Sequence, residues 1–268
     1  MIKIEKDISN IPISLRIPIE ENFEGNIPSP PKTTHKRRKE VIEKKRYIDE
    51  NKFNNRYKIE DIRIELKKIY KNKCAFCEQK IEQYHIEHYR PKKEYYWLAF
   101  SWDNLLMACA TCNENKGTHF ELEGAKTSFR NTTSNIKKIN ECSVEYDVRE
   151  KPKMVNPEIT DPLGEINFKK NGVIESDNIR FEYTIEKCQI DRKPLNDARR
   201  KLLNDFENDI RSELTLNKDI TQQNIIIGTL TRKFIRDFKN KENPFLAFRD
   251  YTITNDWLND IVKKVKKS

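Results

Sequence analysis

The sequence predicts an α+β protein, in which a small metal-stapled module precedes a mainly helical region with one β-hairpin. The first observation behind this prediction is a pair of Cys-x-x-Cys motifs, formed by Cys74, Cys77, Cys109 and Cys112. The second is the polar segment HIEHYRPK between the two motifs. The third is the recurrence of apolar residues at helical spacing in the second half of the chain.

The composition indicates a folded protein with a heavily charged surface. Of the 268 residues, 35% are charged and 36% hydrophobic, and the net charge is +9. A positive surface favours polyanionic partners, although lysine-rich faces are also often only solvated. No apolar stretch is long enough to span a membrane, and the N-terminus MIKIEKDISN lacks a signal-peptide core. We therefore expect a cytoplasmic protein without a membrane partner or disulfides.

The chain divides into three predicted parts: residues 1–45, 46–125 and 126–268. In the first part, the proline-rich NIPSPPK that ends near residue 33 predicts an arm or linker, which is either a tethered tail, as we expect, or a docked segment. The run HKRRKEVIEKKR at residues 35–46 predicts a basic helix. That helix presents either a solvated face or a face that contacts phosphates.

The second part begins with a helix that delivers the first cysteine pair. Ile59, Ile62, Leu66 and Ile69 recur at helical spacing just before Cys74. We expect this apolar stripe to pack on the cysteine module.

The third part is predicted to combine helices with a small hairpin. Asn171 and Gly172 separate two short apolar runs, which is a strong signal for a hairpin with a two-residue loop. Pro194 then opens a helix, with Asp191 as a possible cap. A further packed element runs from NPFLAFRDY to Trp257. The buried stripes of two long helices are expected at Leu195, Ala198, Leu202, Phe206 and Ile210, and at Ile226, Ile227, Leu230, Phe234 and Phe238.

The four paired cysteines predict a structural zinc site. One Cys-x-x-Cys motif is ambiguous between redox chemistry and metal binding, but two in a cytosolic chain favour a metal. Zinc prefers four soft ligands in a tetrahedron, and four thiolates leave no position at which water could be activated. The two remaining cysteines, Cys142 and Cys188, are expected to be packed or free thiols.

A second polar cluster lies between and just after the cysteine motifs. Glu87 and His88 are adjacent on a predicted strand or hairpin arm, and Asn104 stands in WDNLL. Asn113 follows the last cysteine on a predicted helix. Cys109 and Asn113 are four residues apart and so share a helix face. The metal staple is therefore expected to set where Asn113 points.

These residues together resemble the HNH endonuclease family in its cysteine-stapled ββα-metal form, from about Tyr70 to Leu122. The resemblance implies that His88 is the general base and that Asn104 holds its ring. It also implies that Glu87 and Asn113 bind one Mg²⁺ or Mn²⁺ ion. The third family position is asparagine here, which makes the module an HNN variant.

The resemblance leaves the metal ligands and the nucleic-acid contacts partly open. The family more often has aspartate where Glu87 stands, so His85 is an alternative or supporting ligand, or else a surface or packed histidine. Arg90, Lys92 and Lys116 are expected to contact nucleic acid.

A narrower resemblance involves IEHYRPK together with MVNPEITDP at residues 154–162 and TIEKCQIDR after them. It is to the HNH subunits of bacterial Septu-type and retron-associated anti-phage systems. It implies a defence nuclease with an ABC-type ATPase partner. DNA is the favoured target, RNA such as tRNA is an alternative, and a non-catalytic zinc-binding adaptor is a third possibility.

Overall fold

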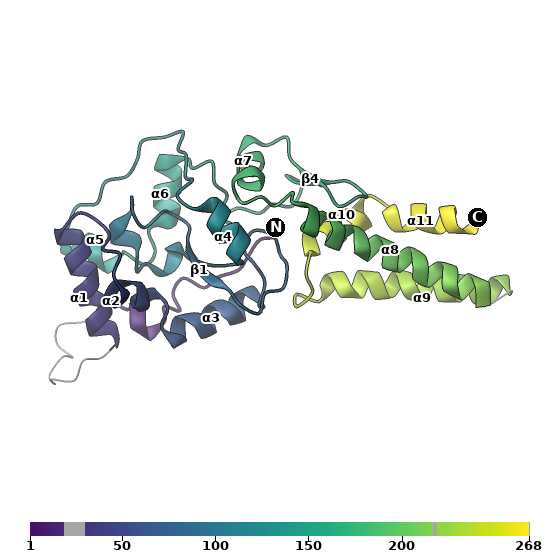
Figure 1. Ribbon diagram of the computed structural model, residues 1–268, viewed down its shortest axis with the longest axis horizontal. Coiled ribbons are helices and arrows are strands. Elements are labelled where there is room, and N and C mark those ends of the chain that lie inside the picture. The colour runs from purple at the N-terminus through teal and green to yellow at the C-terminus, as the bar shows by residue number, and fades with distance from the viewer. Residues whose placement is uncertain (19–29, 217–218, 268) are drawn as a thin grey trace.

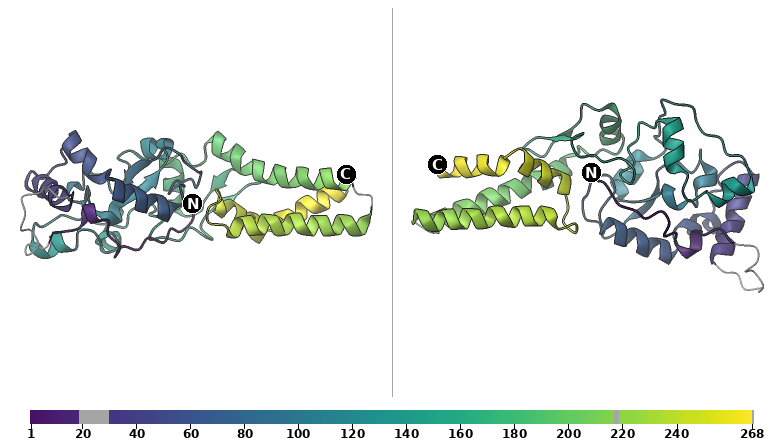
Figure 2. Two further views of the ribbon diagram at one scale, coloured as in Figure 1. Left: turned by 90° about the horizontal axis from the view of Figure 1, so that it is seen from below. Right: turned by 180° about the vertical axis from the view of Figure 1, so that it is seen from behind.

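In the computed structural model the chain forms a rounded part and an elongated helical arm (Figure 1). The structure describes residues 1–18, 30–216 and 219–267. Helices α1 to α6 lie in the rounded part, and α8, α9 and α11 run side by side in the arm in all views (Figures 1 and 2). We call α8 to α11 together the helical arm. Their bounds are Lys193–Leu216, Ile220–Lys239, Leu246–Thr254 and Trp257–Lys266.

The centre of the rounded part is a two-stranded hairpin followed by a helix, which confirms the predicted ββα module. Strand β1, His85–His88, pairs antiparallel with β2, Leu105–Ala108. In this register His85 lies opposite Ala108, and His88 opposite Leu105. Helix α4, Ala110–Lys116, follows β2 directly. Every residue of β2 is buried, so this strand anchors the module in the core.

Helix α3, Glu60–Tyr70, leads into the first cysteine pair as predicted. It buries Ile62, Leu66 and Tyr70, while Ile59 and Ile69 are half-buried against the same core. The helix ends at Lys71, whose φ of 53° is in the left-handed region that terminates helices. The chain then turns back toward Cys74, so the helix fixes where the cysteine module starts.

The first 18 residues pack on the module and are not a tethered arm, so that prediction is wrong for them. Ile4 donates its backbone N–H to Pro157, and the Lys6 ammonium lies 3.8 Å from the centroid of the Trp102 ring. A short 3₁₀ turn, η1, spans Ile13–Leu15. Most of NIPSPPK lies outside the described residues.

The basic run does form a helix, α1, Pro30–Glu43. One of its basic residues serves the core: Arg38 is fully buried and donates to the carbonyls of Leu15 and Phe100. Arg37 pairs with Glu40 on the same helix. The outer side chains, Lys36 and Lys39, stay exposed.

Short elements complete the rounded part and lie around the hairpin. Helix α6 carries acidic residues that meet the central module, and α7 follows it in the chain. The α-helices are α2 (Asn51–Asn54), α5 (Thr133–Lys137), α6 (Ser143–Glu150) and α7 (Ile179–Lys187). The 3₁₀ helices are η3 (Asn55–Tyr57), η4 (Tyr96–Leu98) and η5 (Trp102–Asn104).

The predicted hairpin around Gly172 is confirmed, with a longer loop than two residues. Strands β3, Asn167–Phe168, and β4, Ile174–Glu175, pair antiparallel. Lys169 donates its N–H to Val173, so three residues form the turn. Gly172 has φ of 90°, and a Cβ there would come within 2.0 Å of a backbone oxygen in α8. Glycine is required because both its left-handed backbone and the close approach exclude a side chain.

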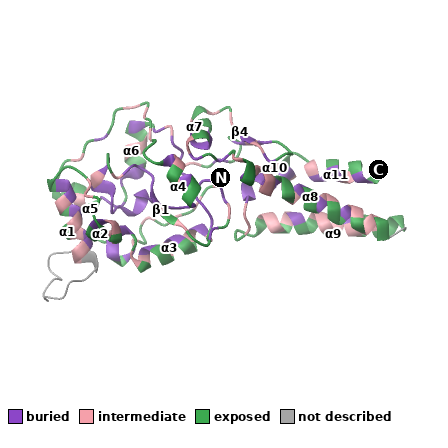
Figure 3. Cartoon of the chain, viewed as in Figure 1, coloured by how far each residue is buried: buried purple, intermediate pink, exposed green. Residues whose placement is uncertain are grey.

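The helical arm follows the predicted apolar pattern with local differences. Leu195, Phe206 and Ile210 of α8 are buried as expected, but Leu203 is buried where Leu202 was predicted to be. The carboxylate of Asp191 accepts from the backbone N–H of Ile174 in β4 and from the side chain of Asn196 in α8, in place of the predicted capping bond to a backbone N–H of α8. Buried positions are most frequent in the rounded part and alternate with exposed ones along the arm helices (Figure 3).

Candidate active site and metal centre

The four paired cysteines meet in one buried cluster. Their sulfur atoms all lie within 4.8 Å of one another, and no disulfide joins them. The Sγ atoms of Cys77 and Cys109 are 3.9 Å apart. A tetrahedral zinc ion with Zn–S bonds of about 2.3 Å would separate sulfurs by about 3.8 Å. The cluster is therefore compatible with a structural zinc ion whose four positions are all taken by thiolates.

The cluster fixes the start of the helix that carries Asn113. Cys109 is the N-cap of α4, and its sulfur accepts from the backbone N–H of Cys112 at 3.4 Å. Ala75, inside the first cysteine motif, donates its N–H to Met107 in β2 at 2.8 Å. Both cysteine motifs are thus bonded to the hairpin or to α4, so an ion bound by the four sulfurs would hold these elements together.

Beside the cluster lies a cavity of about 460 Å³, which we call the His88 cavity. It brings together His85, Glu87, His88 and Asn113, from β1 and α4. Asn104 is buried behind it and does not line it. The rest of the lining is Tyr57, Lys58, Arg63, Tyr84, Ile86, Pro91, Lys92, Lys93, Gly117 and Thr118.

The His88 ring is held by a backbone carbonyl and a tyrosine. Its Nε2 lies 3.0 Å from the carbonyl oxygen of Ala99, and the Tyr57 ring packs edge-on at a centroid distance of 4.6 Å. Because a carbonyl can only accept, Nε2 carries the proton and Nδ1 keeps a lone pair. Burial, and then the positive charge of Lys92, lower the pKa of His88 to about 3. The imidazole is therefore neutral at pH 7 and able to accept a proton.

Asn104 forms hydrogen bonds with the backbone near the His88 ring. The expected contact with the ring itself is not present. Its Oδ1 accepts from the N–H of Arg90 at 2.7 Å. Its Nδ2 donates to the carbonyls of Arg90 and Leu98, at 3.1 and 3.2 Å. One fully buried side chain thus joins the end of β1 to the segment before Ala99, which carries the carbonyl that orients His88.

Glu87 pairs with a lysine that the sequence analysis assigned to nucleic acid. The Nζ atom of Lys116 lies 2.7 Å from Glu87 Oε1 and donates to the carbonyl of His88 at 2.9 Å. Lys116 is fully buried, so the prediction that it contacts nucleic acid is wrong. Burial raises the pKa of Glu87, and the charge of Lys116 opposes that rise. The lysine therefore helps keep Glu87 ionised beside the cavity.

Asn113 and His85 contact each other at the mouth of the cavity. Asn113 Nδ2 lies 3.2 Å from His85 Nδ1, and His85 is exposed. When Nδ2 donates to the ring, Oδ1 of the same amide is left to bind a ligand. Carboxylate and amide oxygens suit Mg²⁺, so Glu87 and Asn113 fit an oxygen-ligated divalent ion, with His85 orienting the amide.

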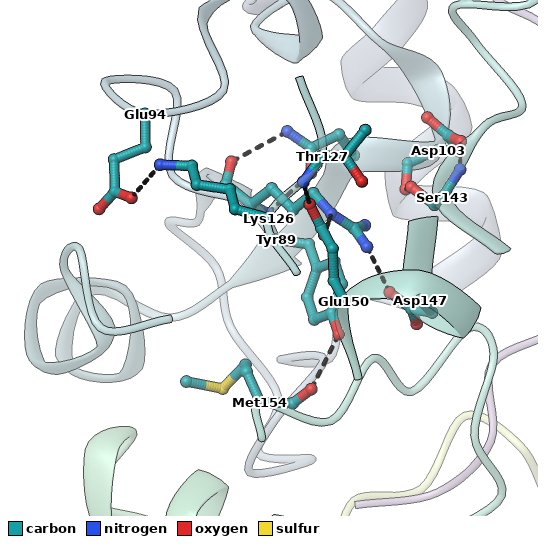
Figure 4. A network of polar contacts seen from close by, with 11 residues as sticks. Tyr89, Glu94, Asp103, Lys126, Thr127, Ser143, Asp147, Glu150 and Met154 are labelled. Carbon is teal, nitrogen blue, oxygen red and sulfur yellow. Dashed lines mark hydrogen bonds and ion pairs between the residues drawn. The ribbon is translucent and has the colours of Figure 1, made fainter. Parts of the chain in front are cut away.

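Arg90 is part of the core, and the prediction that it contacts nucleic acid is wrong. Its side chain is fully buried and donates from Nε to Glu150 at 2.8 Å and from Nη2 to Asp147. Figure 4 shows both acids of α6 within this network, where Glu150 also accepts from the backbone of Thr127. A fully buried guanidinium that is paired with two carboxylates is not available to phosphate.

Lys92 remains at the cavity, and further basic residues join it. Its Nζ donates to Tyr57 OH at 2.8 Å and to Asn54 at 3.1 Å. Lys58, Arg63 and Lys93 line the same cavity with exposed side chains. Tyr57, Lys58 and Arg63 could not be found from the sequence, because they precede the cysteine motifs and no spacing links them to His88.

No helix in the described ranges 1–18, 30–216 and 219–267 is long and apolar enough to cross a membrane. Cys142 and Cys188 are buried and outside the metal cluster, as expected.

Comparisons with known proteins agree with the geometry. The family model described as HNH endonuclease matches residues 74–119, which contain both cysteine motifs, β1, β2 and α4. Over 264 residues the chain is 29% identical to Septu protein PtuB of Bacillus mycoides (strain KBAB4), and the match covers 85% of each protein. It is also 33% identical over 99 residues to Septu protein PtuB of Bacillus thuringiensis, covering 34% of this chain and 37% of that protein. Tyr57, Lys58 and Arg63 of the His88 cavity precede the family match.

Proposed function

We propose that this chain, an HNH endonuclease similar to Septu protein PtuB over most of its length, hydrolyses nucleic-acid phosphodiester bonds in the His88 cavity. The observation that carries the proposal is the neutral, carbonyl-oriented His88 beside Glu87 and Asn113 in one cavity. Nucleic-acid hydrolysis fits the basic lining of that cavity, where Lys92, Lys58 and Arg63 can meet phosphates.

In this reaction His88, Asn104 and Lys116 have different roles. Nδ1 of His88 accepts a proton from the water that attacks the scissile phosphate, because Nε2 is committed to Ala99. Asn104 keeps that geometry by joining the two backbone segments on which it depends. Lys116 holds Glu87 through one carboxylate oxygen and leaves the other oxygen for a ligand.

A divalent ion, Mg²⁺ or Mn²⁺, would be held by Glu87 and Asn113 and would stabilise the charge that develops on the phosphate. His85 supports this site by fixing the orientation of the Asn113 amide. The four-cysteine cluster would hold zinc, which cannot take part in the reaction because its thiolates leave no open position.

The biological setting is also a proposal. The Septu relatives and the motifs IEHYRPK and MVNPEITDP favour a nuclease of a bacterial anti-phage system, acting in the cytoplasm with an ABC-type ATPase partner. A retron-associated system is the alternative setting. We favour DNA as the target. RNA is the alternative, because a site that binds phosphate does not distinguish the two sugars. The division into residues 1–45, 46–125 and 126–268 is retained as the proposed organisation.

The test compares His88→Ala with His119→Ala, a matched change of an exposed histidine that does not line the cavity. Both variants are offered labelled duplex DNA and labelled tRNA with Mg²⁺ or Mn²⁺, with and without the ATPase. Loss of a general base reduces the cleavage rate roughly 10²–10⁴-fold, so His88→Ala should lose that much and His119→Ala almost nothing. Unchanged cleavage in a folded His88→Ala protein would remove His88 from the mechanism.

The same assay decides between the nuclease and a non-catalytic zinc-binding adaptor. An adaptor would bind nucleic acid equally well with or without Mg²⁺ and cut neither substrate. Cleavage that requires the divalent ion excludes the adaptor.

A further inference from the structure

The end of the helical arm nearest the nuclease module contacts the first cysteine loop, residues 73–79, from two sides. On one side of this loop, Lys73 donates its ammonium to the carbonyls of Lys241 and Asn243, at 2.6 and 3.0 Å. These carbonyls follow the C-terminus of α9, where a positive charge is favourable.

On the other side of the loop, Glu78 meets the N-terminus of α10. Its Oε2 accepts from the backbone N–H groups of Leu246 at 2.7 Å and Ala247 at 3.3 Å. A carboxylate at a helix N-terminus is stabilised by the unsatisfied N–H groups there. The charges that flank the cysteine loop are therefore matched to the two helix ends of the arm that face it.

Arg192, the residue before α8, reaches the sulfur atoms themselves. Its Nη1 lies 3.5 Å from the Sγ of Cys112, and its Nη2 lies 3.7 Å from Cys109 and 3.9 Å from Cys77. Nη2 also donates to the side chain of Gln79 at 3.3 Å. Arg192 belongs to the IDR sequence, which the proposed reaction does not use.

The positive charge of Arg192 suits a cluster of thiolates. Four thiolates around a divalent ion carry a net charge of −2, and burying such a charge is unfavourable unless donors or cations offset it. N–H donation to a ligating sulfur also fixes the orientation of that ligand.

We propose that Arg192 is a positioning residue of the zinc site and that, with Lys73 and Glu78, it makes this site the joint between the nuclease module and the helical arm. Zinc binding and arm docking then stabilise each other, because a coupling between two sites acts equally in both directions. The inference rests on the zinc assignment made above and goes beyond the nuclease reaction.

The experiment uses the full-length chain and three variants. Arg192→Ala removes the donor, Arg192→Lys keeps the charge without the planar fork, and Arg200→Ala removes an exposed arginine of α8 as the matched control. Zinc content is measured by mass spectrometry, and zinc release to a coloured chelator is followed by absorbance. Hydrogen exchange of the arm is recorded before and after removal of zinc.

Removal of a partner that orients a metal ligand typically costs 10–100-fold in metal affinity. Arg192→Ala should therefore release zinc 10- to 100-fold more readily, Arg192→Lys should be intermediate, and Arg200→Ala should match the unmodified chain. In the unmodified chain, zinc removal should lower exchange protection at the start of α8 and of α10.

Equal zinc release in all variants, or an arm whose protection survives zinc removal, would overturn the inference. If Arg192→Ala is insoluble, the lysine variant and the exchange measurement on the unmodified chain still decide. A chain purified without zinc would instead refute the zinc assignment, so the two failures are distinguishable.

Discussion

Replacing Arg90 should destabilise the protein without weakening its contact with nucleic acid. The sequence motif and the structure make opposite predictions for this residue. Arg90 belongs to IEHYRPK and was expected to contact nucleic acid, whereas the structure places it in the core. The side chain is fully buried and donates to Glu150 and Asp147 of α6. Arg90→Met keeps much of the apolar stem and removes the charge and its donors.

The magnitude follows from the burial of the partners. Glu150 is fully buried, and its second oxygen already accepts from Thr127 at 2.8 Å. Removal of one member of a buried pair costs about 3–5 kcal/mol, because the other charge is left without compensation. The double variant Arg90→Met with Glu150→Met removes both charges, so it should cost less than the sum of the single changes, by roughly 2 kcal/mol.

The assay is urea unfolding of the zinc-loaded chain, followed by circular dichroism, with Arg149→Met as the control. Arg149 is an exposed neighbour of Glu150, and its replacement should change the free energy of unfolding by less than about 0.5 kcal/mol. The reasoning fails if Arg90→Met unfolds at the urea concentration of the unmodified chain, or if its main defect is a reduced salt dependence of DNA binding.

Three further predictions concern the cavity and its metals. Lys58→Ala and Arg63→Ala should raise KM without changing kcat, and each should lower the salt slope of binding by about one. Lys68→Ala, which changes a lysine on the helix of Arg63 but outside this cavity, should do neither. Acid should lower the free energy of unfolding of the unmodified chain more than that of His88→Gln. Between pH 6.5 and about 3, His88 binds a proton in the unfolded chain but not in the folded one. This difference should lower the free energy of unfolding by about 2 kcal/mol between pH 7 and pH 5. A urea titration at both pH values checks this, and equal losses would contradict the burial of a neutral His88. Removal of Mg²⁺ should stop cleavage without shifting the melting temperature, whereas removal of zinc should unfold the module in a calorimetric scan.

The module was predictable because its signals are local. Cysteine pairs that bind one ion must come together, and the helix after Cys109 places Asn113 one turn from the cluster. Glu87 and His88 are adjacent in a strand that pairs with the strand before Cys109. The spacing of a few residue types therefore determined both the hairpin and the helix.

The roles of the charged residues were not predictable from spacing. Lys116 and Arg90 stand among cations near the motif, but each is buried against an acid distant in sequence. The acid of Arg90 comes 60 positions later in the chain, and that of Lys116 comes 29 positions earlier. In both cases the acid balances the buried charge, and only tertiary packing brings that acid there. Lys92, in contrast, lines the cavity and is only half-buried, with its ammonium donating to Tyr57 and Asn54.

The environment of His88 is built from two parts of the chain, and this bears on what the matched segment can do alone. The family match begins at Cys74, yet Tyr57 packs against the base and bonds to Lys92. Burial is the largest cause of the low pKa of His88, and Tyr57 contributes to that burial. Without residues 57–63 the imidazole would be open to water, and its pKa would return toward the ordinary value near 6.5. In the proposed mechanism the matched segment therefore carries the reacting groups, whereas the preceding helix and turn cover the His88 imidazole and add Lys58 and Arg63 to the lining of the cavity.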